Sequence, residues 1–282
     1  MSKKLNYTLS NNLSIPSLAF GTWQAEDGPM AVNAVTSALD AGYRHIDTAM
    51  MYGNEESVGK AVKLSNIPRN EIFITTKLNN QIRGYDETIK AIKERLELMD
   101  TDYLDLFLIH WPNPVKFRDN WKALNAESWR AFEDMYKEGN LKAIGVSNFE
   151  PHHMDALLET ASITPMVNQI RICPGDEPTE IIEYCNKKNI LIEAYTPLGK
   201  GRLFDNQDLI NLASKYGKTV AQLIIRWHLQ KGYLPLPKSV TPARIQENFQ
   251  VFDFAIDKND MEFMSNIESS FDGPIMPDEI AF

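Results

Sequence analysis

Two kinds of segment alternate along most of the chain: short apolar runs, and longer stretches in which apolar residues recur every three or four positions. The run at residues 104–112 is apolar almost throughout and ends in His110, Trp111 and a proline. Such a run is typical of a parallel strand that is buried on both faces. The stretch at residues 86–99 places its apolar residues on one face of a helix. The alternation therefore predicts a series of βα units.

A helical stretch follows each of eight apolar runs, which end near residues 20, 47, 77, 110, 146, 170, 194 and 237. Eight βα units predict the α/β class and a (β/α)8 TIM barrel that covers residues 1–282 as a single domain. A doubly wound sheet is the alternative, but its usual glycine-rich first turn, G-x-G-x-x-G, does not occur. Strand residues around Asn11 and Asn12 predict an N-terminal β-hairpin that closes the bottom of the barrel. Residues 269–282 are expected to form a C-terminal tail near its mouth.

Composition places the chain among ordinary globular proteins, with 282 residues, 43% hydrophobic and 24% charged. The net charge of −9 argues against a nucleic acid as partner. Cys173 and Cys185 give neither a disulfide framework nor a metal-ligand spacing, so no metal is expected. Residues 1–4 are not followed by the apolar segment of a signal peptide, and no run has the roughly 20 apolar residues of a membrane span. We therefore expect a cytoplasmic protein that is a monomer.

Reactive side chains stand at the ends of three successive predicted strands: Asp47, Lys77 and His110. Tyr52 lies in the loop after the first of them. The carboxyl ends of the strands meet at one rim of a barrel, so these four groups are expected to lie together. Each alone has an ordinary structural explanation, such as a helix cap, a solvated charge or a packed ring. Together they favour chemistry.

The four groups suit the donation of a proton to a carbonyl oxygen. A phenol has a pKa of about 10, and a neighbouring ammonium is expected to lower it. A carboxylate can hold the lysine in place, and an imidazole can donate a hydrogen bond to a substrate oxygen. The set has no activated Ser or Cys nucleophile and no carboxylate pair suited to glycoside cleavage. A reduction would need a separate source of hydride.

The segment between the last predicted strand and its helix offers Lys238, Ser239 and Arg244. Barrels often bind phosphate at this place, and two cations with a hydroxyl suit a phosphomonoester. A capped helix with a nearby lysine would explain the same residues equally well. Both interpretations stay open on these residues alone.

Several motifs resemble those of the aldo-keto reductases, in the family's order and between about residues 13 and 272. They are GYRHIDTA at residues 42–49, YGNE at 52–55, the strand end at Lys77, HWP at 110–112, GVSNF at 145–149, VNQ at 167–169 and KSV at 238–240. The chain looks closest to short bacterial members, the 2,5-diketo-D-gluconate reductase-like enzymes. The resemblance implies reduction of small aldehydes or ketones (α-dicarbonyls, keto sugars or similar compounds) with NADPH/NADP+ as cofactor.

The resemblance also implies roles for individual residues. Tyr52 would donate the proton. Lys77 and Asp47 would tune its pKa, and His110 would orient the substrate carbonyl. The residues implied at the nicotinamide are Ser147, Asn148, Gln169 and, stacked on its ring, Tyr195. Those implied at the adenosine phosphate and the pyrophosphate are Lys238, Ser239, Val240, Arg244, Glu247, Asn248 and Leu198. Those implied at the substrate pocket are Trp23, Trp111 and His110.

The chain departs from the family after Gln169, where residues 170–176 read IRICPGD in place of an acidic residue and a His-Pro pair. Two other functions are kept as alternatives. One is a non-catalytic NADP(H)-binding regulatory subunit on the same barrel, which would be expected to lack part of the catalytic set. The other is a barrel lyase that forms a Schiff base at Lys77 and needs no nicotinamide.

Overall fold

Parallel strands form the centre of the computed structural model, which describes residues 6–282. Each strand pairs in parallel with the next one along the chain, so the sheet order is the sequence order. The strands are β3 (Phe20–Gly21), β4 (His45–Asp47), β5 (Phe73–Leu78), β6 (Leu106–Ile109), β7 (Ile144–Ser147), β8 (Val167–Arg171), β9 (Leu191–Tyr195) and β10 (Leu234–Pro235). These strands end at or within a few residues of the predicted positions, and the (β/α)8 prediction is confirmed.

Backbone hydrogen bonds between the first and last strands close the sheet into a barrel. Ala19 N–H donates to Pro235 O at 3.1 Å, and Gly21 N–H donates to Pro237 O at 3.0 Å. Gly21 suits this seam because a Cβ on it would lie 3.2 Å from Leu236 O. The absence of a side chain thus lets the two strands approach each other closely.

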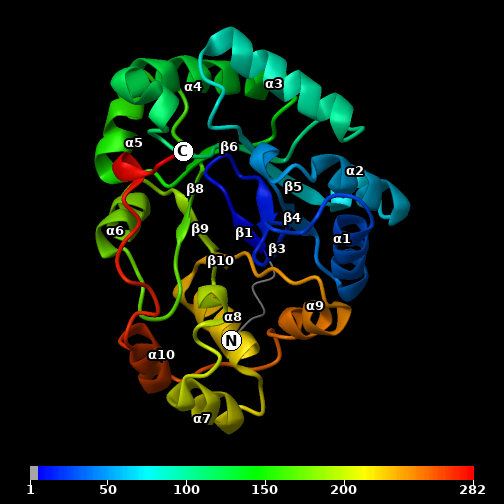
Figure 1. Ribbon diagram of the computed structural model, residues 1–282, viewed down its shortest axis with the longest axis vertical. Coiled ribbons are helices and arrows are strands. Elements are labelled where there is room, and N and C mark those ends of the chain that lie inside the picture. Colours follow the sequence, from blue (N-terminus) through cyan, green and yellow to red (C-terminus); the bar gives the residue numbers. More distant parts are fainter. Residues whose placement is uncertain (1–5) are drawn as a thin grey trace.

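Helices surround the strands (Figure 1). They are α1 (Pro29–Ala41), α2 (Glu55–Leu64), α3 (Tyr85–Leu98), α4 (Trp121–Lys137), α5 (Pro151–Leu158), α6 (Thr179–Lys187), α7 (Gln207–Lys215), α8 (Val220–Lys231), α9 (Pro242–Phe249) and α10 (Lys258–Ser265). Successive strands follow one another counterclockwise in Figure 1. Because βαβ connections are right-handed, this view faces the carboxyl ends of the strands.

The N-terminal hairpin covers the opposite end of the barrel. Strands β1 (Asn6–Thr8) and β2 (Ser14–Pro16) pair in antiparallel fashion. Tyr7 OH donates to Tyr233 O at 3.2 Å, just before β10, and Asn11 Nδ2 donates to Lys142 O at 3.0 Å, just before β7. The predicted hairpin at the bottom of the barrel is therefore confirmed.

The first five residues, which include Met1 to Lys4 of the N-terminal prediction, lie outside the described part of the chain. Among the helices at residues 6–282, none combines the length and the apolar character needed to cross a membrane. The single-domain boundaries and the monomeric state stay predictions.

Candidate active site

A buried ion pair lies at the carboxyl ends of β4 and β5. Lys77 Nζ donates to Asp47 Oδ1 at 2.7 Å, to Asp47 Oδ2 at 2.9 Å and to Thr48 O at 2.8 Å. The exposed fractions of the two side chains are 0% and 5%. Burial alone would lower the pKa of Lys77, but the Asp47 carboxylate and the Tyr52 phenol raise it above its usual value. Lys77 is therefore an ammonium held by oxygen atoms.

Tyr52 ends the short 3-10 helix η1 (Met50–Tyr52) beside this pair. Lys77 Nζ lies 5.1 Å from the centroid of the Tyr52 ring. Burial raises the pKa of Tyr52, Lys77 lowers it, and the net pKa is above the usual value. Lys77 thus lowers the pKa of Tyr52 as predicted, but burial raises that pKa by more. The expectation from the sequence, a net lowered pKa of Tyr52, is therefore wrong.

Asn54 fixes the loop that carries Tyr52. Its fully buried side chain donates from Nδ2 to Thr22 O at 3.0 Å and to Ala25 O at 2.9 Å, and its Oδ1 accepts from Thr48 Oγ1 at 2.8 Å. Asn54 directly precedes α2 at the N-cap position, yet its side chain makes no capping bond to that helix. Its role is to fasten the loop to β3 and β4.

His110 follows β6 directly and faces the same rim. The centroid of its ring lies 5.9 Å from that of Tyr52. Burial, with contributions from Lys77 and Arg83, holds the pKa of His110 well below its usual value. The imidazole is neutral at physiological pH, as its expected role in hydrogen bonding requires.

Gln169 links the ion pair to a second buried carboxyl group. Its Nε2 donates to Asp47 Oδ2 at 2.9 Å and to Glu193 Oε2 at 2.7 Å. All three side chains are buried. Burial, reinforced by Asp47, raises the pKa of Glu193 to about 8. Sequence reasoning missed Glu193, because one acidic residue within an apolar strand was the only sign of it.

Ser147 ends β7 beside Gln169, Asn148 follows it, and Tyr195 ends β9. Tyr195 OH donates to Asn148 Oδ1 at 2.7 Å, and Asn148 Nδ2 donates to His110 O at 3.0 Å. Ser147 Oγ donates to Gln169 O at 2.8 Å. The structure thus brings together the four residues that the resemblance implied at a nicotinamide.

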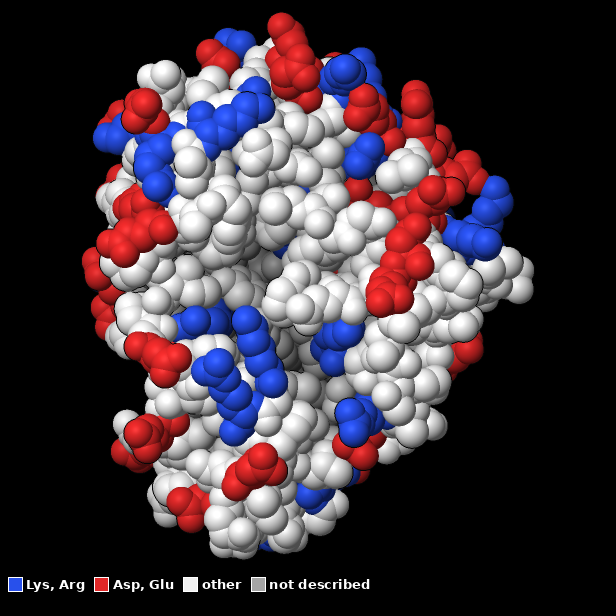
Figure 2. Space-filling model, viewed as in Figure 1, with Lys and Arg blue, Asp and Glu red and all other residues white. Residues whose placement is uncertain are grey.

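The predicted phosphate-binding residues lie on the loop before α9 and on that helix. Lys238 Nζ donates to Gln24 O at 3.1 Å, and Arg244 is exposed. Figure 2 shows Lys and Arg side chains on both sides of a hollow in the face that carries the strand ends. In a chain with a net charge of −9, this local positive charge suits an anionic ligand.

The other residues predicted around the adenosine phosphate and the pyrophosphate have structural partners or lie on the surface. Glu247 Oε1 accepts from Thr219 Oγ1 at 2.8 Å, and Ser239 Oγ accepts from Thr241 N–H at 3.1 Å. Asn248 is buried, and Val240 is 40% exposed. Leu198, partly buried, directly precedes the short 3-10 helix η4 (Gly199–Gly201). Contact of any of them with a cofactor stays a prediction.

Two tryptophans stand at the mouth. Trp23 is 42% exposed, and Lys200 Nζ lies 5.3 Å from its ring centroid. The ring of Trp111 meets that of Phe282 edge to face, with centroids 5.3 Å apart. The last residue of the tail therefore packs against Trp111.

The segment that departs from the family pattern holds the start of the tail. Arg171 Nε donates to Asp176 Oδ2 at 2.6 Å, and its Nη2 donates to Gly273 O at 2.6 Å. The guanidinium also lies 4.2 Å from the centroid of the Phe271 ring. Residues 170–176 thus serve as an anchor for the tail.

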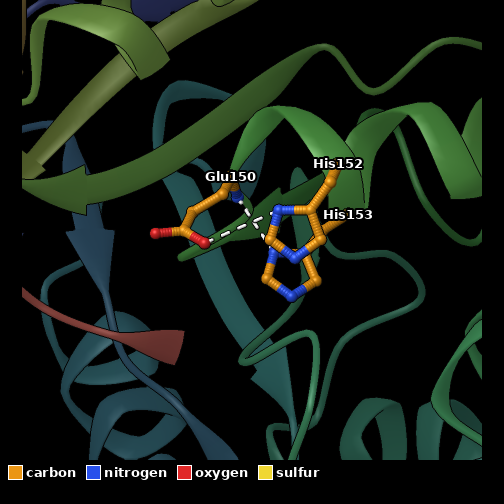
Figure 3. A group of neighbouring side chains, drawn as sticks. All are labelled: Glu150, His152 and His153. Atoms are coloured by element: carbon orange, nitrogen blue, oxygen red, sulfur yellow. Dashed lines mark hydrogen bonds and ion pairs between the residues drawn. The ribbon is translucent and has the colours of Figure 1, made fainter. Parts of the chain in front are cut away.

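A second anchor joins the tail to the first turn of α5. Asp278 accepts from His153 Nε2 at 2.9 Å and from Asn113 Nδ2 at 2.7 Å, and its second oxygen lies 3.0 Å from His152 Nε2. Glu150, His152 and His153 put potential metal-ligand atoms within 4.8 Å of one another (Figure 3). However, His153 Nδ1 already accepts from Glu150 N–H at 3.2 Å. With both ring nitrogens engaged, His153 fastens the tail.

A parallel α/β barrel with an ion pair, a phenol and a neutral imidazole at its carboxyl rim defines a barrel oxidoreductase that acts on carbonyl or alcohol groups. The model of the Aldo/keto reductase family matches residues 17–269. The chain belongs to this family and is an oxidoreductase.

Named relatives align over nearly the whole chain. Glyoxal reductase of Bacillus subtilis (strain 168) is 42% identical over 274 residues, which cover 97% of this chain and 96% of the relative. The 9,11-endoperoxide prostaglandin H2 reductase of Trypanosoma cruzi (strain CL Brener) is 44% identical over 257 residues, covering 90% and 88%. The crystal structure of a Gox0644 mutant in complex with NADPH superposes with a TM-score of 0.88 at 37% identity and covers 98% of each chain.

Proposed function

We propose that this protein reduces small aldehydes or ketones with NADPH and that Tyr52 is the proton donor. The observation that carries the proposal is the Lys77–Asp47 pair beside Tyr52, with neutral His110 facing the same ring. The name of the glyoxal reductase relative favours α-dicarbonyl compounds among the candidate substrates. Keto sugars and similar compounds are further candidates.

The four residues divide the proton chemistry among them. A bound nicotinamide cofactor supplies the hydride. Tyr52 gives its proton to the carbonyl oxygen as negative charge develops there, and the Lys77 ammonium stabilises the phenolate that remains. Asp47 holds Lys77 in place through two hydrogen bonds. His110 donates a hydrogen bond to the same oxygen and so orients the carbonyl.

The residues present fit such a cofactor. Gln169, Asn148 and Ser147 offer both donors and acceptors, which suits a carboxamide. Lys238 and Arg244 offer two cations for a phosphate group on the adenosine ribose, with Ser239 as a hydroxyl donor. NADPH carries that phosphate, and the complex of the Gox0644 mutant contains NADPH.

The Schiff-base alternative is disfavoured by the state of Lys77. An amine must be neutral to attack a carbonyl. The three hydrogen bonds that Lys77 Nζ donates to oxygen atoms and its raised pKa keep it charged. The regulatory-subunit alternative is disfavoured because Asp47, Tyr52, Lys77 and His110 are all in place.

The test follows NADPH absorbance with a panel of aldehydes, α-dicarbonyls and keto sugars. Tyr52→Phe is expected to reduce kcat by about 10²–10⁴-fold, since it removes a positioned general acid. Tyr103→Phe, the same change in the loop before β6, serves as the matched control. Failure of the wild type to oxidise NADPH with any substrate, or full activity of Tyr52→Phe, would refute the proposal.

We further propose that the protein acts as a cytoplasmic monomer without a nucleic-acid partner. The net charge of −9 supports the last part. Sedimentation at working concentration tests the oligomeric state.

A further inference from the structure

Glu193 is a fully buried carboxyl group that the proton chemistry above does not use. It lies on β9, with its residue 0% exposed. Gln169 Nε2 donates to Glu193 Oε2 at 2.7 Å and to Asp47 Oδ2 at 2.9 Å. The same amide nitrogen therefore lies between two carboxyl groups.

This arrangement fixes which way round the Gln169 amide sits. An amide NH2 offers two N–H donors, while an amide oxygen offers none. The Asp47 carboxylate can only accept, so the NH2 group must face Asp47 Oδ2 at 2.9 Å, and the same nitrogen also donates to Glu193 Oε2 at 2.7 Å. The amide oxygen of Gln169 then points away from these two carboxyl groups. In residues 6–282 it makes no hydrogen bond, and it remains available to a ligand.

The place of Gln169 makes this orientation matter for a cofactor. Ser147 and Gln169 pair in register on β7 and β8, next to Asn148 at the rim. A carboxamide bound there would find an acceptor in the Gln169 oxygen and donate its own N–H to it. If the amide of Gln169 turned over, that acceptor would become a donor, and the N–H of the carboxamide would lose its partner.

We propose that Glu193 is a positioning residue that acts through Gln169. Together with Asp47, it holds the amide nitrogen of Gln169 and so presents the amide oxygen to a carboxamide bound at the rim. This inference rests on the proposed function, because it assigns Gln169 to the nicotinamide.

Glu193 is a costly residue at a position where an apolar side chain would pack without desolvation. The charged and titratable groups that face it are Asp47, Lys77 and His45. His45 Nε2 lies 4.0 Å from Glu193 Oε1 and 2.8 Å from Thr75 Oγ1. Burial lowers the pKa of His45 to about 3, so the histidine is neutral and does not pair with the carboxyl group. A carboxyl group at position 193 therefore does little for the stability of the fold. Its contact with the Gln169 amide explains its presence better.

The test compares Glu193→Leu, Glu193→Gln, Gln169→Leu and the Glu193→Leu/Gln169→Leu double variant. The readout is the Kd for NADPH, measured by quenching of the intrinsic fluorescence of the protein, together with kcat/KM and the melting temperature. Glu193→Leu removes one of the two acceptors that hold the Gln169 amide. It is expected to raise the Kd for NADPH about threefold to tenfold, while its melting temperature is unchanged or higher.

Glu193→Gln keeps an acceptor oxygen for Gln169 and is expected to keep the wild-type Kd for NADPH. The double variant is expected to bind NADPH no more weakly than Gln169→Leu, because Glu193 acts only through Gln169. A wild-type Kd in a folded Glu193→Leu enzyme would overturn the proposal, as would an equal rise of the Kd in Glu193→Gln. Failure of the proposed function is distinguishable, because the wild type itself would then not oxidise NADPH.

Discussion

Lys77 Nζ and Asp47 Oδ1 lie 2.7 Å apart inside the barrel, where almost no water reaches either side chain. Removal of the ammonium leaves a buried carboxylate without its partner. We therefore expect Lys77→Met to abolish reduction and to lower the free energy of unfolding by about 3–5 kcal/mol. Urea unfolding measures the loss. The Asp47→Asn/Lys77→Met double variant should recover part of it, and a single variant as stable as the wild type would contradict this account.

The protonation state of Tyr52 predicts the pH dependence of the reaction. Burial raises the pKa of Tyr52 despite the opposing effect of Lys77, so the phenol keeps its proton through neutral pH. We expect kcat for carbonyl reduction to stay level across neutral pH and to fall only above the ordinary tyrosine pKa of about 10. A pH profile at saturating substrate measures this. A decline that starts near neutral pH and is absent from Tyr52→Phe would be the contrary result.

Cofactor choice should depend on the two cations near α9. Replacing Lys238 or Arg244 with Met removes a charged partner of the adenosine phosphate. We expect KM for NADPH to rise about tenfold or more in each variant, with KM for NADH nearly unchanged. Lys137→Met is the matched control, because Lys137 ends α4 and pairs with Asp134 at 3.1 Å. An equal rise in KM for NADPH and NADH, or a wild type that prefers NADH, would show that Lys238 and Arg244 do not bind the adenosine phosphate.

Glu193 should make the protein less stable as pH rises. Its pKa is raised from 4.5 to about 8 in the folded protein, so between these pH values the folded state keeps a proton that the unfolded state has lost. The free energy of unfolding therefore falls with pH in this window, by up to about 1.4 kcal/mol per pH unit. Glu193→Gln removes this contribution. Denaturant titrations from pH 5 to 8 should show a flatter dependence for Glu193→Gln, and identical slopes would show that Glu193 is ionised throughout.

The hydrogen bonds of Asp278 should control the order of the tail. Asp278→Ala removes the acceptor for His153, His152 and Asn113, which hold the tail to α5 and to the loop after β6. We expect faster amide hydrogen exchange at residues 269–282 and a changed KM for the substrate, with exchange in the barrel strands unchanged. Glu279→Ala, at the exposed neighbouring position, is the matched control. Tail protection equal to that of the wild type would show that the other contacts of the tail suffice.

The strands and the catalytic set could be predicted because both follow from local patterns. An unbroken apolar run marks a strand buried on both faces, and the residue that follows it marks the rim. His110 illustrates this, since it directly follows Ile109 at the end of β6. In contrast, the predicted series of βα units does not include the 3-10 helix η3 (Val115–Asn120).

The remaining features depend on partners that are distant in the sequence. The net pKa direction of Tyr52 depends on how deeply the folded barrel buries it. Asn54 takes its role from carbonyl groups of the first βα loop, which the sequence does not place beside it. The pairing of Asp278 with His153 joins positions 125 residues apart. No local pattern marks such contacts.

The seam between β3 and β10 has a consequence for the order of folding. Its hydrogen bonds join Ala19 and Gly21 to Pro235 and Pro237, which lie near opposite ends of the chain. Pairings so distant along the sequence form late, because the intervening chain must first be ordered. We therefore expect the strands that carry Asp47 and Lys77 to pair before the last strand docks and closes the barrel around their charges. During refolding, strand formation should therefore precede the recovery of activity.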